Sequence, residues 1–291
     1  MDINDIKILR ELAKETAEIA ALPKQEKTRA LWKKLNGLKP VRPMVMIDQI
    51  CWNEFKSDDS LTLRCEGAEA RGLENSLRMQ LYKWKRLPAD MRVENFVRVG
   101  KAITGTGFGV LAQAERIHGD ETSDIFSHRY DNQFKTTADL EKIGRPNVGH
   151  DEAETNRRHD FASEIFEGIL EVKMVGLDPY LSVWDPIATW MGVENVLFAL
   201  ADDPEFMTAL TKKVVSGYMD MLDQAEALGL MAGPQELVHC TGAWTDELPG
   251  KPYDPLKPLT KNMWMFGLAQ MFSTVSPAMF EEYEIDACMP L

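Results

Sequence analysis

The sequence has few cysteines and little pattern among them. Its 291 residues include only Cys51, Cys65, Cys240 and Cys288, and no two of these form a Cys-x-x-Cys pair. It also lacks an Asn-x-Ser/Thr glycosylation site and any apolar run close to the roughly 18 residues that a membrane span requires. These absences argue against a disulfide framework and predict reduced thiols in a cytoplasmic protein.

Positive charge is also in short supply. The 33 Lys and Arg residues are outnumbered by 46 Asp and Glu residues, which gives a formal net charge of −13. A nucleic acid or an anionic membrane is therefore not an expected partner. With 44% hydrophobic and 27% charged residues, the chain has the composition of an ordinary globular protein of one large or two smaller α/β domains.

Helical periodicity is clearest near the start of the chain. Residues 1–40 predict an N-terminal helical segment of two helices, with Asn36-Gly37 as a stop signal. Residues 68–87 predict an amphipathic helix whose stripe forms part of the core. Asp203-Pro204 predicts the cap of a long helix that ends near Gly229. Residues 259–272 and 277–286 predict two further helices.

Short apolar runs alternate with these helices. Runs at 43–48, 94–99, 177–184 and 236–240 predict strands, and several of them end near a carboxylate or a histidine. This order predicts an α/β fold of the (β/α)8 TIM-barrel type over residues 41–291. Only five or six strand–helix units can be counted, so we expect either an incomplete barrel that associates through an open edge or additional strands within 100–135.

The segment 238–250 concentrates residue types that carry chemistry, with His239 and Cys240 at the end of the predicted strand. A histidine and a cysteine are zinc ligands, but adjacent residues of a strand point to opposite faces. Both side chains could bind one metal ion only if the backbone turns there. A buried cysteine beside a hydrogen-bonded histidine is the alternative without a metal.

Two longer segments resemble a known family. Residues 185–205, beginning with Asp185-Pro186, and residues 264–282, including Ser276-Pro277, resemble the uroporphyrinogen decarboxylase superfamily. The resemblance implies a (β/α)8 barrel that lacks its C-terminal part, since the chain ends at Leu291. The superfamily includes a decarboxylase and corrinoid-dependent methyltransferases.

The methyltransferase branch fits the residues better. The decarboxylase has an arginine-rich loop for its polycarboxylate substrate, and residues 43–63 contain no arginine. The resemblance implies methyl transfer between a small methylated donor, such as a phenyl methyl ether or a methylamine, and a corrinoid carried by a partner protein. It also implies a zinc ion, for which His239 and Cys240 are the candidate ligands. The candidate catalytic residues are Asp48, Glu54 and Asp185, and the candidate substrate-binding residues are Trp52, Trp184 and Trp244.

Two other functions remain open from the sequence. One is decarboxylation of a porphyrinogen-like substrate with Asp48 serving the pyrrole nitrogens. The other is a non-catalytic barrel fragment that binds a partner, which the low strand count favours. The chain could then form a homo-oligomer or pair with a complementary C-terminal chain.

Overall fold

The structure is a computed structural model that describes residues 2–55, 58–118 and 126–289. The chain forms two compact units, each built from three separate stretches of sequence. The first unit contains residues 1–102, 151–176 and 231–264, and the second contains 103–150, 177–230 and 265–291. Helices and strands occur in both units, which confirms the α/β class.

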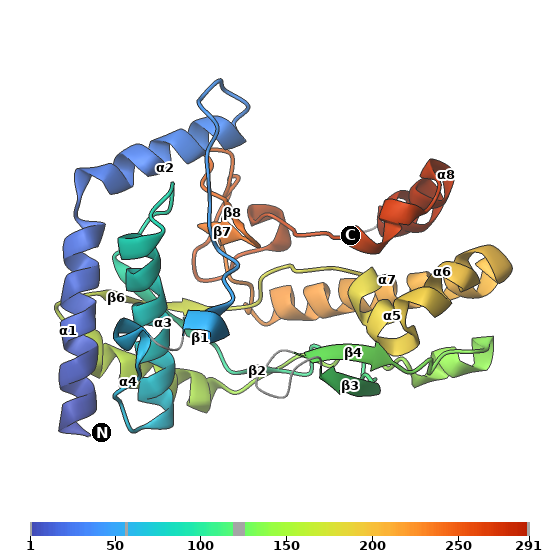
Figure 1. Ribbon diagram of the computed structural model, residues 1–291, viewed down its shortest axis with the longest axis horizontal. Helices are drawn as coiled ribbons and strands as arrows, with labels where there is room; N and C mark the ends of the chain where they lie inside the picture. Colours follow the sequence, from blue (N-terminus) through green and yellow to red (C-terminus); the bar gives the residue numbers. More distant parts are fainter. Residues whose placement is uncertain (1, 56–57, 119–125, 290–291) are drawn as a thin grey trace. The chain divides into compact units, whose positions relative to one another are not determined.

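The two helices predicted within residues 1–40 are present, and they belong to the first unit. Helix α1 (Ile3–Ala20) begins after Asp2, whose carboxylate accepts a hydrogen bond of 2.7 Å from the amide of Asn4. Leu9 and Ala13 on α1 are fully buried. Helix α1 packs against α3 (Ala68–Arg86), and the two lie side by side in Figure 1. The predicted stripe on α3 lies in this core, where Leu77 and Leu81 are each 3% exposed.

A parallel strand pair forms the other part of this core. Strand β1 (Phe96–Gly100) pairs with β6 (Glu171–Val175), and α4 (Glu152–Phe166) packs on both strands. Val97 and Val99 are buried in the core between the helices and the strands. Since side chains alternate along a strand, Phe96 and Arg98 lie on the opposite face. The remaining elements of this unit are α2 (Pro23–Asn36), β7 (Leu237–Val238), β8 (Thr241–Gly242) and the 3-10 helices Trp52–Phe55, Asp59–Leu61 and Thr260–Asn262.

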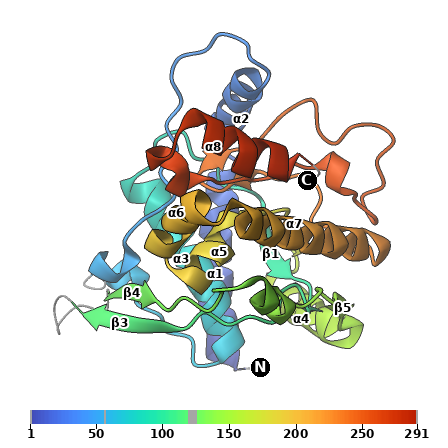
Figure 2. The ribbon, with the colours of Figure 1, turned by 90° about the vertical axis from the view of Figure 1, so that its right-hand side faces the viewer.

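The second unit is built around three helices. Figure 2 shows α5 (Trp184–Met191), α6 (Val193–Asp202) and α7 (Pro204–Ala227) close together, and consecutive helices of the three are in contact. Helix α7 begins as predicted, because the Asp203 carboxylate accepts a hydrogen bond from the Phe206 amide. The other elements are β2 (Ile103–Thr104), β3 (Ala114–His118), β4 (Phe126–Tyr130), β5 (Gly149–His150), α8 (Pro277–Phe280), the π-helix Glu281–Asp286 and the 3-10 helices Thr137–Lys142 and Gln270–Thr274.

Gly217 in the middle of α7 makes room for an aromatic ring. A Cβ atom at this position would lie 3.0 Å from Cδ1 of Phe108 and closer still to Cε1. Phe108 is 7% exposed and packs edge-to-face on Tyr218, with ring centroids 5.0 Å apart. The ring therefore has little space into which it can shift.

We expect Gly217→Ala to lower the free energy of unfolding by about 1–3 kcal/mol, because overpacking outweighs the gain in helix propensity. Gly72→Ala on α3 is the matched control, since a Cβ there meets nothing within 4 Å. The control should raise stability by up to about 1 kcal/mol. Urea unfolding of both variants measures the difference, and equal effects would show that Phe108 does not constrain α7.

Three predicted elements are wrong at the level of local structure. Residues 43–48 form an irregular, partly exposed segment with no neighbouring strand among the described residues. Residues 177–183 are also irregular, with one parallel bridge from Tyr180 to Phe266, and Trp184 begins a helix. Pro186 fits the first turn of α5, where its missing amide hydrogen is not needed. Residues 259–272 form two 3-10 helices separated by irregular chain.

The strands do not form a barrel within the part of the chain that is described. They pair as β1 with β6, β2 with β5, β3 with β4 and β7 with β8, each as a two-stranded sheet. Additional strands within 100–135 were one of the two alternatives that the sequence left open, and β2, β3 and β4 lie there. Residues 119–125 of that region are outside the described residues.

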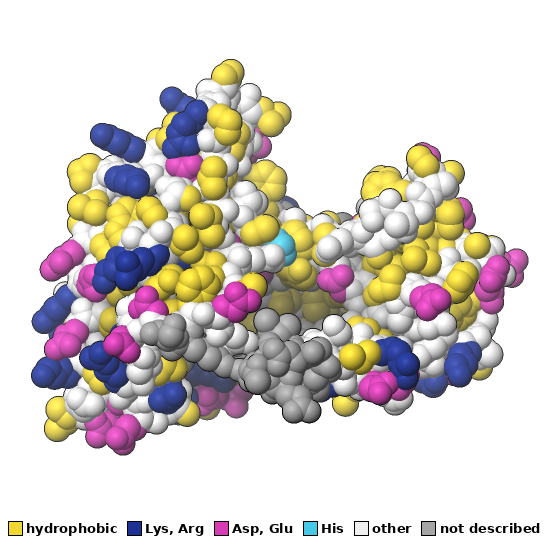
Figure 3. Space-filling view, in the orientation of Figure 1, with side chains coloured by type: hydrophobic (Ala, Val, Ile, Leu, Met, Phe, Trp, Pro, Cys, Tyr) yellow, Lys and Arg dark blue, Asp and Glu magenta, His cyan; other side chains and the backbone are white. Residues whose placement is uncertain are grey.

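Charge is mixed over the surface. In Figure 3, acidic and basic side chains are interspersed over the helices of the first unit. The face shown there carries no broad basic stripe of the kind that a nucleic acid requires. Among the described helices, none has the length and apolar character needed to cross a membrane.

Candidate functional site

The first unit contains a cavity of about 560 Å³, which we call the main cavity. Its volume is within the usual range for small-molecule sites. Three of the predicted site residues, Asp48, Trp52 and Trp244, line it together although they come from distant parts of the sequence. The rest of its lining is formed by Met46, Leu73, Ser76, Leu77, Met79, Gln80, Lys83, Met91, Arg92, Glu94, Phe96, Val97, Arg98, Glu236 and Leu237.

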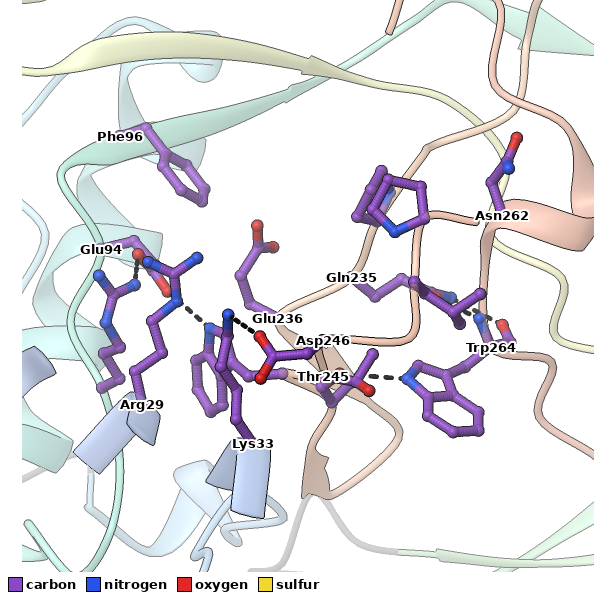
Figure 4. Close-up of a pocket in the computed structure, with 16 residues that line it drawn as sticks. Arg29, Lys33, Glu94, Phe96, Gln235, Glu236, Thr245, Asp246, Asn262 and Trp264 are labelled. Carbon is purple, nitrogen blue, oxygen red and sulfur yellow. Dashed lines mark hydrogen bonds and ion pairs between the residues drawn. The ribbon is translucent and has the colours of Figure 1, made fainter. Parts of the chain in front are cut away.

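A second cavity of about 490 Å³, the side cavity, shares several lining residues with the main cavity. Figure 4 shows Glu236 extending into it, and Lys33 bonded to Asp246 at 2.6 Å on its wall. Trp244 lines both cavities and is 7% exposed. The other shared residues are Arg92, Glu94, Phe96 and Glu236.

The parallel strands explain how Glu236 is held. Arg98 on β1 and Lys173 on β6 are register partners, and both form ion pairs with Glu236. The Lys173 ammonium lies 2.8 Å from the Glu236 carboxylate. Both cations also lie over the Phe96 ring, with Lys173 at 4.9 Å and Arg98 at 5.4 Å from the ring centroid. This polar face of the strand pair was missed by sequence reasoning. The alternation Phe96-Val97-Arg98-Val99 was a signal for it.

Each described cation that lines the main cavity has a negative partner. The Lys83 ammonium forms an ion pair with Asp48, with Nζ 2.8 Å from Oδ1. Arg92 forms an ion pair with Glu94, and Arg98 forms one with Glu236. Among the described residues that line this cavity are three cations and three carboxylates, so the formal charges of this described lining cancel at pH 7. A charged ligand would have to disrupt these pairs, whereas a neutral ligand would not.

Asp90 anchors the segment that carries Asp48 and Trp52. The Asp90 carboxylate accepts hydrogen bonds from the Arg42 guanidinium and, at 2.8 Å, from the Val45 amide. The Asp90 amide in turn donates to the Val45 carbonyl at 2.9 Å. The hydrogen bond that Arg42 donates to the Asp90 carboxylate is the main reason why the pKa of Asp90 lies below its usual value of 3.8. Backbone bonds to Asp90 thus replace the strand pairing predicted for residues 43–48.

This anchor is expected to weaken at low pH. Because the pKa of Asp90 is lowered by folding, its stabilising contribution is present above pH 3.8 and is lost as the pH falls through the lowered value. Asp90→Asn should therefore speed hydrogen exchange of the Val45 amide at pH 7 by roughly tenfold, because the charged acceptor of its hydrogen bond is replaced by a neutral amide oxygen, which accepts a weaker bond. The Val93 amide, which donates to the neutral side chain of Gln25, is the control. Unchanged exchange at Val45 would contradict the anchoring role.

The predicted strand 236–240 is shorter than expected. It ends at Val238, and His239 and Cys240 form the two-residue turn between β7 and β8. His239 has a φ of 51°, and the turns of two-residue hairpins require a positive φ at this position. The backbone therefore turns where the zinc hypothesis required it to. Nδ1 of His239 lies 2.9 Å from Sγ of Cys240.

Zinc nevertheless lacks a complete set of ligands here. Catalytic zinc sites use three protein ligands, and His239 and Cys240 supply two. Within the described ranges, no group of three or more His, Cys, Asp or Glu side chains is placed to hold a metal ion. The residues present do not fit a zinc ion by themselves.

The remaining predicted residues lie outside the two cavities. Glu54 is exposed in the 3-10 helix Trp52–Phe55. Trp184 and Asp185 belong to the second unit, where Trp184 is 1% exposed and packs on Phe272. Asp185 is exposed. Burial of the Tyr218 hydroxyl, together with the negative charge of Asp185, raises the pKa of Tyr218 to about 12.

Comparison of the chain with protein-family models, curated proteins and solved structures finds no match.

Proposed function

We propose that this protein transfers a methyl group between a small neutral donor, of which a phenyl methyl ether is the best example, and a corrinoid carried by a partner protein. The observation that carries the proposal is the main cavity, which combines aromatic walls with a balanced set of charges. A phenyl ring can lie against Trp52 and Trp244 without a counterion. A cationic methylamine fits this charge balance less well than the ether does.

The Asp48–Lys83 pair supplies the polar chemistry of the proposal. When the methyl group leaves an ether, the oxygen keeps the electron pair of the broken bond and becomes an anion. Lys83 carries an ammonium group that can donate a hydrogen bond or a proton to that oxygen. Asp48 holds this ammonium at 2.8 Å on the wall of the cavity. The corrinoid would accept the methyl group on its cobalt when the partner delivers it.

The proposed function is accompanied by a proposal about the family and fold of the chain. We propose that the chain belongs to the uroporphyrinogen decarboxylase superfamily, whose barrel is built from β–α–β units. The parallel pair of β1 and β6, covered by α4, is one such arrangement and supports this placement. The paired cations of the main cavity support the methyltransferase branch over a decarboxylase, because a polycarboxylate requires cations that are available to it.

A spectroscopic assay tests the proposed function. Cob(I)alamin, the purified protein and a panel of phenyl methyl ethers should show conversion of the cob(I)alamin spectrum to that of methylcobalamin. Lys83→Met should lower the rate by about 10²-fold, because it removes a proton donor. Lys85→Met is the matched control, since Lys85 on the same helix pairs with Glu15 at the surface. No conversion with any donor, or equal loss in both variants, would contradict the proposal.

A further inference from the structure

Helix α2 contributes two cations to the side cavity. Arg29 and Lys33 lie one turn apart, so both side chains project from the same face of the helix. Both line the side cavity, and neither lines the main cavity. Lys33 is held by Asp246 at 2.6 Å. Within the described part of the chain, the ion pair of Arg29 is with Glu26 at 3.7 Å, which is too long for a hydrogen bond.

Glu26 is engaged by another arginine. Its carboxylate accepts a hydrogen bond of 2.8 Å from Arg92, and this bond is the main reason why the pKa of Glu26 lies below its usual value of 4.5. Nε of Arg29 and Nε of Arg92 are both buried, and neither has a hydrogen-bond partner among the described residues. Buried donors without a partner are rare in folded proteins, and they indicate an acceptor from outside the chain. The Arg29 side chain is 42% exposed, so a ligand can reach its guanidinium group.

The charges around the side cavity have a positive balance. Glu236, which extends into the cavity in Figure 4, forms ion pairs with two cations, so its carboxylate does not make the cavity negative. The described charged residues that line the cavity, together with their ion-pair partners, are the cations Arg29, Lys33, Arg92, Arg98 and Lys173 and the carboxylates Glu26, Glu94, Glu236 and Asp246. Cations exceed carboxylates by one in this set, which matches a ligand with a single negative charge.

Aromatic rings form much of the remaining wall. Phe96, Trp244 and Trp264 line the side cavity, and the indole N–H groups of both tryptophans already donate hydrogen bonds within the chain. The rings therefore offer apolar surface to a ligand. In Figure 4, Arg29 and Trp264 lie on opposite sides of Glu236. The volume of about 490 Å³ leaves room for a ring and a charged group.

We propose that the side cavity binds a small monocarboxylate with a flat apolar body, and that the carboxylate pairs with Arg29. A guanidinium group is planar and can donate two parallel hydrogen bonds to a carboxylate. A polycarboxylate fits less well, because its further charges exceed the positive balance of the cavity. This inference goes beyond the proposed function, since it concerns another cavity and involves no methyl transfer.

Isothermal titration calorimetry at pH 7 with benzoate and benzamide tests the proposal in the full chain. The two compounds have nearly the same shape, and only benzoate is charged. We expect benzoate to bind at least about tenfold more tightly, as charge-assisted hydrogen bonds predict. Arg29→Met should weaken benzoate binding by about tenfold and leave benzamide binding unchanged. Lys27→Met is the matched control, because Lys27 is an exposed cation on α2 that lines neither cavity.

Several results would overturn the proposal. No binding of benzoate, or equal affinity for benzoate and benzamide, would do so in the wild type, where the folding of a variant plays no part. Benzoate binding that Arg29→Met leaves unchanged, or that Lys27→Met weakens equally, would also do so. Trp52 lines the main cavity and not the side cavity, so loss of benzoate binding in Trp52→Ala would place the ligand in the wrong cavity. The outcome of the corrinoid assay affects none of these results, so the two proposals fail separately.

Discussion

Replacement of Glu74 by alanine is expected to lower the free energy of unfolding by about 3–5 kcal/mol, which is the cost of breaking a buried ion pair by removing one partner. Glu74 on α3 has no exposed surface. Its carboxylate accepts hydrogen bonds from the amides of Arg64 and Cys65 and, at 2.7 Å, from Nε of Arg78. The alanine variant leaves both amides and the Arg78 charge without this acceptor.

Glu69→Ala is the matched control for this result. Glu69 lies on the same helix but pairs with Arg157 at the surface, and such pairs contribute less than about 1 kcal/mol. Urea unfolding at pH 7 measures both variants. A loss at Glu74 no larger than the loss at Glu69 would show that the buried hydrogen bonds of Glu74 to Arg64, Cys65 and Arg78 do not stabilise the fold.

The effect of Glu74 should also depend on pH. Burial tends to raise its pKa, but hydrogen bonds from the Cys65 and Arg64 amides and from Arg78 outweigh this and lower it. The contribution is thus present above the usual value of 4.5 and is lost as the pH falls through the lowered value. The difference between wild type and Glu74→Ala should narrow as the pH is lowered from 6 towards 3.

Replacement of Trp244 by alanine is the second change with a large expected effect, also about 3–5 kcal/mol of stability. Trp244 packs on Trp32 with ring centroids 6.3 Å apart, and its Nε1 donates to Glu94. The close packing extends to Gly242, where a Cβ would approach the Trp32 ring to 2.6 Å. The variant should also join the main and side cavities, because Trp244 lines both.

Trp52→Ala is the control for Trp244. Trp52 is only partly buried, and of the two cavities it lines only the main one. Its loss should therefore weaken ligand binding with a smaller effect on stability. Thermal unfolding compares the two variants. If Trp244→Ala costs less than about 1 kcal/mol, the ring is not part of a close-packed wall.

The helices were predictable because their signals are local. The apolar stripe of 68–87 matches α3, and the Asp203 cap lies where the sequence places it. Short apolar runs carry less information, since periodicity alone cannot separate a strand from an irregular or helical segment. Residues 43–48 illustrate this, because hydrogen bonds of Val45 with the carboxylate and the amide of Asp90 replace the strand partner that the prediction assumed.

The site was predictable only in part, for a related reason. Of the six candidate catalytic and substrate-binding residues, Asp48, Trp52 and Trp244 line one cavity, whereas Glu54, Trp184 and Asp185 do not line it. Their polar partners were not found, because the ion pairs of Glu236 with Arg98 and Lys173 join residues far apart in the sequence. The geometry of His239 and Cys240 depended on where the strand ends. A turn at these two residues brings together side chains that a continuous strand would separate.

The most direct test of the main cavity is ligand binding measured by isothermal titration calorimetry. We predict that methoxybenzene binds the wild type and that benzene-1,3,5-tricarboxylate does not. Trp52→Ala should weaken methoxybenzene binding by about tenfold, because it removes on the order of 1–2 kcal/mol of apolar contact. Tighter binding of the tricarboxylate, or methoxybenzene binding that is unchanged in Trp52→Ala, would contradict the assignment of this cavity to a neutral aromatic ligand.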